Sequence, residues 1–217
     1  EVKRDVKAVY GELLLPITKE LEATLAVRQD KYDGFGSTTN PKVSARYQPM
    51  PQLLFRGSYS TGFRVPTFNQ LYNGVIFSAS GVDRVDPATC PGLVVNPLVV
   101  GCEVIRPETV TGGKRDLGPE EAKMSSLGFV VEPIPNLSIG VDWWSIDRTG
   151  TIQVLGVETL YRNYALFPER FRRDATGTID AIDNRWVNAG ETQTQGVEAS
   201  MRGGLAAMGL KLSAGLE

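Results

Sequence analysis

Alternation of apolar and polar residues with a period of two is the feature that most restricts the fold of this 217-residue chain. In the stretch that begins at Leu21, for example, Leu21, Ala23, Leu25 and Val27 occupy one face of an expected strand. Six stretches show this pattern, at residues 21–30, 42–47, 53–64, 126–131, 137–143 and 196–202. Less regular stretches at 6–15 and 210–216 raise the number of expected strands to about eight. The sequence therefore predicts an all-β fold.

The connections between these stretches alternate in length. Short, proline-marked turns are expected at Pro16–Lys19, Pro49–Pro51 and Glu132–Asn136, with a fourth at Gly203–Gly209. Long connections are expected at Asp33–Asn40, about 64–118 and about 149–185. Short connections at one end of the strands and long ones at the other are typical of a transmembrane β-barrel. A soluble β-sandwich also shows alternating strands, but its loops need not sort by length in this way.

The polar sides of the strands carry many charges. They hold Glu22, Arg28, Asp30, Lys42, Arg46, Arg56, Asp142, Glu198 and Arg202. In a soluble sheet these side chains would face solvent, whereas in a wide barrel they would line the lumen while the apolar sides meet lipid. Aromatic residues near strand ends fit the interfacial girdles of a membrane barrel: Tyr32, Tyr47, Tyr59, Phe63, Trp143 and Trp186.

Composition excludes several classes of function. The formal net charge is −2, so there is no basic excess to neutralise nucleic-acid phosphates. The chain contains no histidine, which removes Ser-His-Asp triads and histidine-containing zinc sites. The carboxylate pairs Asp83/Asp86 and Asp180/Asp183 lie in loop-like segments and are interpreted as solvated charges. We therefore expect neither an enzyme nor a metal or cofactor site.

The two cysteines, Cys90 and Cys102, bracket a short stretch rich in Gly, Pro and Val. Such spacing in a loop favours a disulfide formed in an oxidising compartment, with two free thiols as the alternative.

Four ordered motifs resemble the TonB-dependent outer-membrane receptor family. Phe63-Arg64-Val65-Pro66, followed by Phe68-Asn69-Gln70-Leu71-Tyr72, resembles a strand-to-loop exit of these receptors. Residues 36–42 and 112–120 are similar to a loop-to-strand entry and to the return into the barrel, although Lys114 and Arg115 depart from the family pattern. Residues 188–190, with Gly196-Val197-Glu198, are similar to a strand near the end of the barrel.

The resemblance implies an antiparallel transmembrane β-barrel of 22 strands in the bacterial outer membrane, with an N-terminal plug domain and a TonB box. Residues 1–217 show neither of these, nor the aromatic-terminated final strand of such barrels, so we expect a partial barrel domain of about eight strands. The implied function is TonB-energised uptake of a scarce nutrient, such as an iron–siderophore, a vitamin or an oligosaccharide. The implied partners are the plug domain, the TonB complex, the ligand and the bilayer.

Two groups of candidate residues follow. The long connections offer aromatic rings, one amide and guanidinium groups for a ligand: Tyr72, Asn73, Phe77, Arg84, Tyr161, Arg162, Tyr164 and Arg170. The lumen side offers Arg28, Arg56, Asp142 and Glu198 for contact with the plug. Two alternatives remain open at this point, a soluble β-sandwich that binds a glycan or protein, and a small closed barrel that serves as a structural membrane protein.

Overall fold

The computed structural model describes residues 3–205 and 210–216. The chain divides into two compact units. Unit 1 comprises Glu1–Val65, Pro119–Thr151 and Gly190–Glu217, and unit 2 comprises Pro66–Gly118 and Ile152–Ala189.

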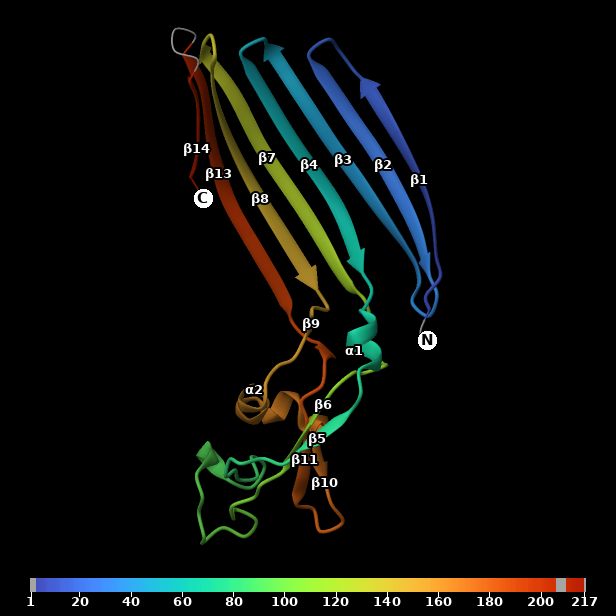
Figure 1. The fold of residues 1–217 in the computed structure, drawn as a ribbon, viewed down its shortest axis with the longest axis vertical. Helices are drawn as coiled ribbons and strands as arrows, with labels where there is room; N and C mark the ends of the chain where they lie inside the picture. Colours follow the sequence, from blue (N-terminus) through green and yellow to red (C-terminus); the bar gives the residue numbers. More distant parts are fainter. Residues whose placement is uncertain (1–2, 206–209, 217) are drawn as a thin grey trace. The chain divides into compact units, whose positions relative to one another are not determined.

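Unit 1 is one antiparallel sheet of eight long strands (Figure 1). The strands are β1 (Val6–Pro16), β2 (Leu21–Tyr32), β3 (Gly36–Met50), β4 (Leu53–Arg64), β7 (Glu120–Ile134), β8 (Leu137–Thr149), β13 (Glu191–Leu205) and β14 (Leu210–Leu216). Their order in the sheet follows the chain, β1-β2-β3-β4-β7-β8-β13-β14, and every neighbouring pair is antiparallel. The prediction of an all-β antiparallel fold is confirmed, and the irregular first and last stretches do form strands.

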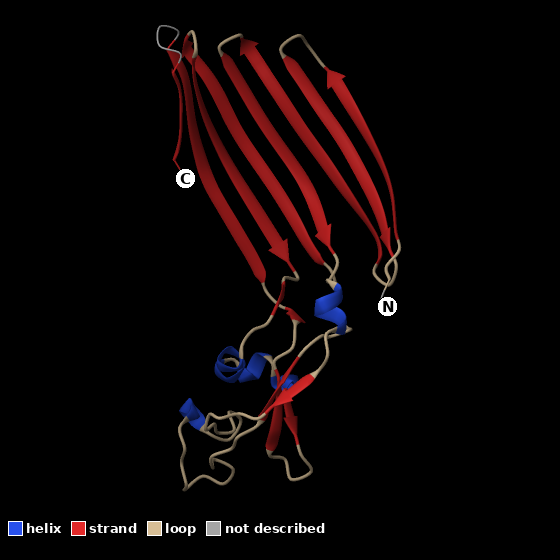
Figure 2. Ribbon diagram, viewed as in Figure 1, coloured by secondary structure: helices blue, strands red, loops and turns tan. Residues whose placement is uncertain are grey.

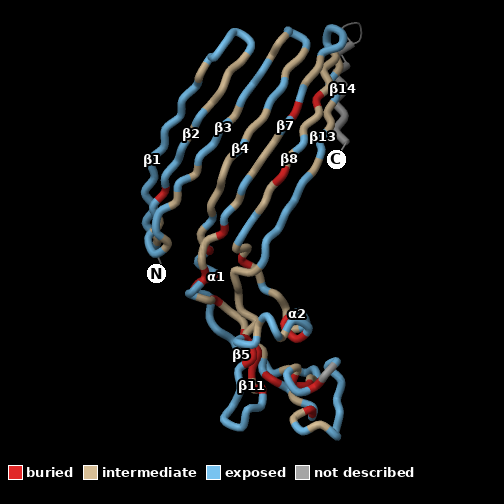
Figure 3. The backbone as a smooth tube through the Cα atoms, turned by 180° about the vertical axis from the view of Figure 1, so that it is seen from behind, coloured by how far each residue is buried: buried red, intermediate tan, exposed pale blue. Residues whose placement is uncertain are grey.

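Register between the strands sorts the side chains onto two faces. Directly paired residues share a face, so the pairing of Tyr47 with Phe55, of Phe55 with Phe129 and of Phe129 with Val141 builds one continuous apolar face. Many large apolar side chains of this face are exposed, and Figure 3 colours few residues of the sheet as buried. Its Leu127 side chain, for example, is 64% exposed. The opposite face carries the charged residues and is called the polar face below.

Two short turns lie where the sequence predicts them. The β1–β2 turn is fixed by Thr18, whose hydroxyl oxygen accepts hydrogen bonds from the Glu20 and Leu21 amides. The β7–β8 turn contains Asn136, which adopts a positive φ of 67° that asparagine tolerates well. The first residues of the predicted turn at Gly203–Gly209 belong to β13, which continues to Leu205. The rest of that turn lies outside the described residues.

The prediction of a long connection at Asp33–Asn40 is wrong. Strand β3 already begins at Gly36, so only three residues connect it to β2. Gly34 and Gly36 adopt φ values of +80° and +78°, which allow the chain to reverse within this short turn. The polar residues that follow, from Ser37 to Asn40, pair with β2 instead of forming a loop.

Unit 2 is built from both long connections and has secondary structure of its own. It contains α1 (Phe68–Tyr72), β5 (Ile76–Ser78), η1 (Pro91–Leu93), β6 (Glu108–Thr111), β9 (Ile152–Gln153), α2 (Val157–Arg162), η2 (Tyr164–Leu166), η3 (Pro168–Arg170), β10 (Phe171–Arg173), β11 (Ile179–Asp183) and β12 (Val187–Asn188). All helices in the described residues belong to this unit (Figure 2). None of them is long and apolar enough to span a membrane.

A four-stranded sheet in the order β10-β11-β6-β5 joins the two connections in unit 2. The joining step is the parallel pairing of β11 with β6, in which Ile182 lies opposite Thr109. A buried cluster joins Leu160 and Tyr161 of α2 to Phe171, Ile179 and Ile182 of this sheet, with Ile105 of the first connection packed against it. The long connections therefore fold together around one small core.

Candidate functional site

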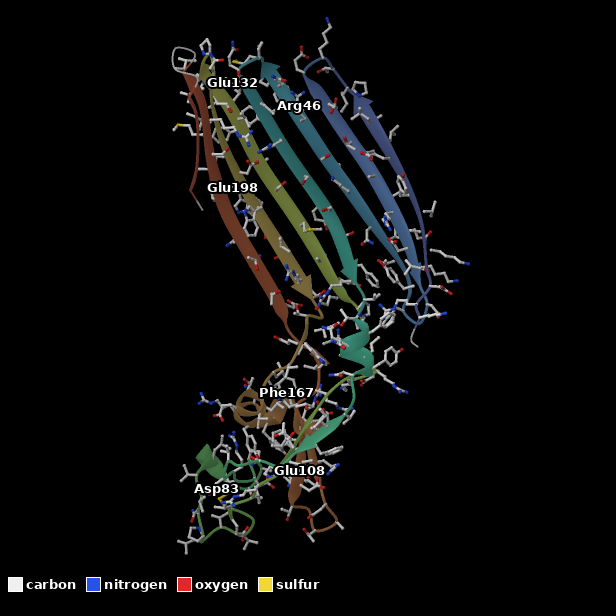
Figure 4. All side chains as sticks on the ribbon, in the orientation of Figure 1. Arg46, Asp83, Glu108, Glu132, Phe167 and Glu198 are labelled. Atoms are coloured by element: carbon white, nitrogen blue, oxygen red, sulfur yellow. A yellow bond between two sulfur atoms is a disulfide. The ribbon has the colours of Figure 1, made fainter. Side chains whose placement is uncertain are left out.

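A row of charged side chains crosses the polar face of unit 1. Register places Glu22 opposite Arg46, Arg46 opposite Arg56, Arg56 opposite Gly128, Gly128 opposite Asp142, and Asp142 opposite Glu198. Figure 4 labels Arg46 on β3 and Glu198 on β13. The row thus brings together residues that lie far apart in the sequence, with Glu22, Arg46 and Arg56 on one side of the glycine and two anions on the other.

The centre of this row is an ion pair that spans a strand. Arg56 of β4 donates from Nε and Nη2 to the two carboxylate oxygens of Asp142 on β8, at 2.8 and 2.5 Å. Between them lies Gly128 of β7, where an added Cβ would lie only 2.6 Å from Cγ of Asp142. The absence of a side chain at Gly128 therefore lets the arginine and the aspartate meet across β7 in a bidentate geometry.

Two further ion pairs lie nearer the other end of the polar face. Arg28 binds the carboxylate of Asp30 on the same strand, with 2.8 Å between Nη2 and Oδ1. Arg64 binds Glu120, its register partner, at 2.6 and 2.7 Å. Arg28, Arg56, Asp142 and Glu198, the predicted lumen residues, accordingly share one face of the sheet. Their contact with a plug stays a prediction.

In unit 2, the side chain of Arg84 on the first long connection contacts residues of the second. Its Nη1 donates to Oε2 of Glu158 at 2.7 Å, and its guanidinium lies 4.9 Å from the centre of the Tyr161 ring. Glu158 also accepts from Arg162 at 3.0 Å. Hydrogen bonds from Arg84 and then Arg162 lower the pKa of Glu158 below its ordinary value. Val85, Leu93 and Val95 join Arg84, Glu158 and Tyr161 around a cavity of about 200 Å³.

Several of the ligand candidates are exposed in unit 2. The rings of Tyr72 at the end of α1 and Phe77 on β5 are about half exposed. The guanidinium carbon of Arg115 lies 5.7 Å from the centre of the Tyr72 ring, and that of Arg172 lies 5.5 Å from the centre of the Phe77 ring. Arg162 is exposed on α2, and Tyr164 is half-buried with its ring against Phe171. Asn73 caps α1 and accepts the Gly113 amide with its backbone oxygen at 3.0 Å. Their contact with a ligand stays a prediction.

Tyr161 and Arg170 lie inside unit 2, with only 3% and 4% of their surface exposed. Tyr161 packs in the apolar cluster, and burial raises the pKa of its hydroxyl to about 12. Arg170 lies 3.6 Å from Asp183, whose carboxylate also binds Arg185 at 2.8 Å. Both side chains are therefore buried in unit 2, and their contact with a ligand stays a prediction.

An ion pair that the sequence did not predict links Asp86 to Arg173. The Asp86 carboxylate is nearly buried and accepts both terminal nitrogens of Arg173 and the Ala88 amide. Burial alone would raise the pKa of Asp86, but the hydrogen bonds from Arg173 and from the Ala88 amide lower it below its ordinary value. The Asp86 backbone oxygen also accepts the Cys90 amide at 2.8 Å. Asp86 therefore anchors the start of the cysteine loop to β10.

The predicted disulfide between Cys90 and Cys102 is confirmed. Both cysteines are buried with Val85, while the loop that they close exposes apolar side chains, including Leu98 and Val100 at 93% each. The described residues contain no group of three or more His, Cys, Asp or Glu side chains that could hold a metal ion.

Comparison with protein families covers both units of the chain. Residues 1–216 match the family model described as "TonB dependent receptor-like, beta-barrel". No curated protein sequence gives a significant match.

Solved structures with the same fold are siderophore receptors and a peptide importer. A ferric enterobactin receptor (PfeA) mutant from Pseudomonas aeruginosa, in complex with enterobactin, has a TM-score of 0.70 at 18% identity, and the match covers 98% of this chain and 26% of that chain. The siderophore receptor PirA from Acinetobacter baumannii gives 0.64 at 18% identity, with coverages of 94% and 26%. The RagAB peptide importer gives 0.54 at 14% identity, with coverages of 91% and 19%. The chain thus spans about a quarter of the length of these siderophore receptors.

Substitution of Gly128 by alanine tests the strand-spanning ion pair. We expect Gly128→Ala to separate Arg56 from Asp142, because the new Cβ would occupy the space of the carboxylate. The measurement is the guanidinium unfolding midpoint of the full-length protein in lipid vesicles, which should fall. Gly11→Ala is the matched control, since a Cβ there meets nothing within 4 Å. Equal midpoints for the two variants would contradict the role of Gly128.

The pH dependence of unit 2 tests the Asp86 anchor. A carboxylate whose pKa is lowered by folding stabilises the fold above its unfolded pKa, about 3.9, and loses this contribution as the pH falls through its lower folded value. We therefore expect amide protection in residues 86–102 to persist from pH 7 to pH 5 and to decrease below about pH 4. Asp86→Asn should reduce protection already at pH 7, by about 2 kcal/mol.

Hydrogen exchange, corrected for the intrinsic rate at each pH, measures this protection. Asp116→Asn serves as the control, because the Asp116 carboxylate is exposed and ion pairs of exposed groups contribute little. If Asp86→Asn behaved like this control, the anchor would be wrong.

Proposed function

The chain belongs to the TonB-dependent receptor-like β-barrel family, and we propose that it forms part of the wall of an outer-membrane receptor that takes up a scarce nutrient. In this proposal, energy comes from the TonB complex, and the plug domain and remaining strands come from the rest of the full-length protein. The role is transport and not catalysis.

The observation that carries this proposal is the uncovered apolar face of unit 1. Leu25 is 44% exposed, Leu127 64% and Val197 61%, and similar side chains continue across β1 to β13. Soluble proteins rarely expose an apolar surface of this extent. In a bilayer the hydrocarbon chains would cover it, while the polar face would line the lumen.

The edge of the apolar face also runs obliquely across the strands. On β2 the apolar positions reach Val27, on β4 Tyr59, and on β8 only Trp143, where they give way to Ser145 and Asp147. Through register, Val27 lies one same-face row beyond Tyr59 and two rows beyond Trp143, whereas the apolar face of an untilted sheet would end at the same row on every strand. Barrel strands tilt by about 40° from the membrane normal, so an oblique edge supports a membrane position.

Strand length supports the same position. Strands β3, β7 and β13 each have 15 residues. At about 3.4 Å per residue they span about 50 Å, or about 38 Å along the normal after a tilt of about 40°. This exceeds the apolar band of about 25 Å in such barrels, so the polar strand ends would project into water.

Ligand capture is assigned to unit 2, which carries the exposed candidates Tyr72, Phe77 and Arg162. Aromatic rings beside guanidinium groups suit a planar, anionic ligand. The relatives of known structure include siderophore receptors, one of them solved with enterobactin, so we propose an iron–siderophore ahead of a vitamin or an oligosaccharide.

The alternatives receive less support. A β-sandwich needs a second sheet over the apolar face, and unit 1 contains a single sheet in its described residues. A small closed barrel needs its first and last strands to pair. In the described part of the chain, β1 pairs with β2 and β14 with β13, and β1 and β14 do not pair with each other.

Arginine substitutions test which face meets lipid. Leu25→Arg, Phe55→Arg or Ile139→Arg on the apolar face should each cost about 2–4 kcal/mol near the bilayer midplane. Thr24→Arg, Ser58→Arg and Ser138→Arg on the polar face are matched controls on the same strands and should cost less. Unfolding of the full-length receptor in lipid vesicles measures both sets. Equal losses in the two sets would reverse or remove the assignment of the faces.

Cysteine labelling tests the topology. Antiparallel strands that each cross the membrane once place successive connections on alternate sides. Single cysteines at Asp33, Ala79 and Thr176 should therefore react with an impermeant maleimide on intact cells, whereas those at Lys19, Pro51 and Pro135 should not. The native disulfide can remain, because its sulfurs do not react with maleimide. A mixed labelling pattern would exclude the barrel and the transport function with it.

A further inference from the structure

The sheet of unit 1 is split at one end between β3 and β4. Strand β3 pairs with β2 as far as Gly36, and β4 pairs with β7 as far as Arg64. The pairing of β3 with β4, however, ends at Lys42 and Ser60. Residues Gly36–Pro41 and Thr61–Arg64 therefore have strand partners on one side only, and we call the gap between them the seam. Figure 1 shows β3 and β4 diverging toward the end of β4 that precedes α1.

The seam begins at a proline, which interrupts the hydrogen-bonded pairing of β3 with β4. Pro41 is its first residue on β3 and has no N–H to donate. Across the seam, side chains make the contacts between the two parts of the sheet. The hydroxyl of Thr61 donates to the amide oxygen of Asn40 at 3.4 Å, and the rings of Tyr32 and Phe63 lie 5.5 Å apart. These few contacts span the seam and leave two facing backbone edges open.

A groove of about 490 Å³ lies at the seam. It is lined by Thr38–Pro41 of β3 and Thr61 of β4, and it continues over the neighbouring ends of β7, β8 and β13. The groove lies beyond the apolar face, because the residues that follow Leu127 and Trp143 on that face are serines and then charged residues. Water can therefore reach it.

The charges along the groove are mostly negative. Glu121, Asp147 and Glu191 contribute three carboxylates and Lys123 one ammonium, so the formal net charge is −2. Glu121 and Glu191 both lie opposite Thr149, one on each neighbouring strand. A partner with positive charge is favoured at this position.

We propose that the seam binds an extended, basic peptide segment by strand addition. Open strand edges present alternating N–H and C=O groups, and a second polypeptide backbone in extended conformation is the ligand that satisfies them in series. Glu121 lies opposite Phe63 of the seam, and Asp147 and Glu191 continue the negative charge along the groove, so lysine or arginine side chains are favoured on this segment. A peptide docking site of this kind goes beyond the uptake function proposed above, and it needs no contribution from unit 2.

Fluorescence anisotropy on the full-length receptor in detergent tests the proposal. The probe is a fluorescein-labelled decapeptide of alternating lysine and threonine. The control probe has the same sequence with alternate backbone nitrogens methylated, so it keeps its charge but loses half of its N–H donors. We expect saturable binding of the first probe and at least tenfold weaker binding of the second. Equal affinities would show attraction by charge alone and overturn strand addition, as would an absence of binding.

Substitutions locate the binding. Replacement of both Glu121 and Glu191 by glutamine should weaken binding of the first probe about tenfold. Glu132→Gln is the matched control, since Glu132 lies on β7 at the opposite end of the sheet (Figure 4) and should leave the affinity unchanged. If both variants bound the probe as the native protein does, the seam would not be the site. Because peptide binding is measured and not uptake, such a failure would leave the proposed transport function intact.

Discussion

Strand register is the constraint on which the structure of unit 1 depends. Side chains alternate between the two faces, so a slip of one residue in β2 would move Leu25 to the polar face and Arg28 to the apolar one. The same register aligns Arg56, Gly128 and Asp142 on three successive strands. Their ion pair therefore depends on two correct pairings at once.

The sequence predicted the long strands because their alternation has the same period as the pleat. The prediction of a long connection at Asp33–Asn40 was wrong for a physical reason. Beyond the apolar face, both sides of a strand meet water, so alternation disappears although pairing with β2 continues to Gly36. Polar residues such as Ser37–Asn40 then have the composition of a loop and the hydrogen bonds of a strand. Pairing, and not polarity, sets where the strand begins.

In unit 2 the sequence predicted the disulfide, because a short spacing restricts the possibilities. It did not predict the parallel pairing of β6 with β11 or the ion pair of Asp86 with Arg173, since both join residues about 70 or more positions apart. Burial of Tyr161 and Arg170 was also missed. A local signal for β11 did exist in the sequence, because the apolar residues Ile179 and Ala181 flank the polar Asp180. This alternation has the period of a short strand, and Ile179 and Ala181 are buried while Asp180 is more exposed.

The long-range contacts of unit 2 all run between its two long connections, and this bears on ligand capture. Arg84 with Glu158, Asp86 with Arg173, and β6 with β11 each join the first long connection to the second. The buried cluster does the same through Ile105, while the disulfide closes the first connection near Asp86. Separate loops would respond to a ligand one at a time. Because these contacts cross between the connections, a ligand that shifts one of them must displace the other or break one of these ion pairs, so the two connections respond to it together.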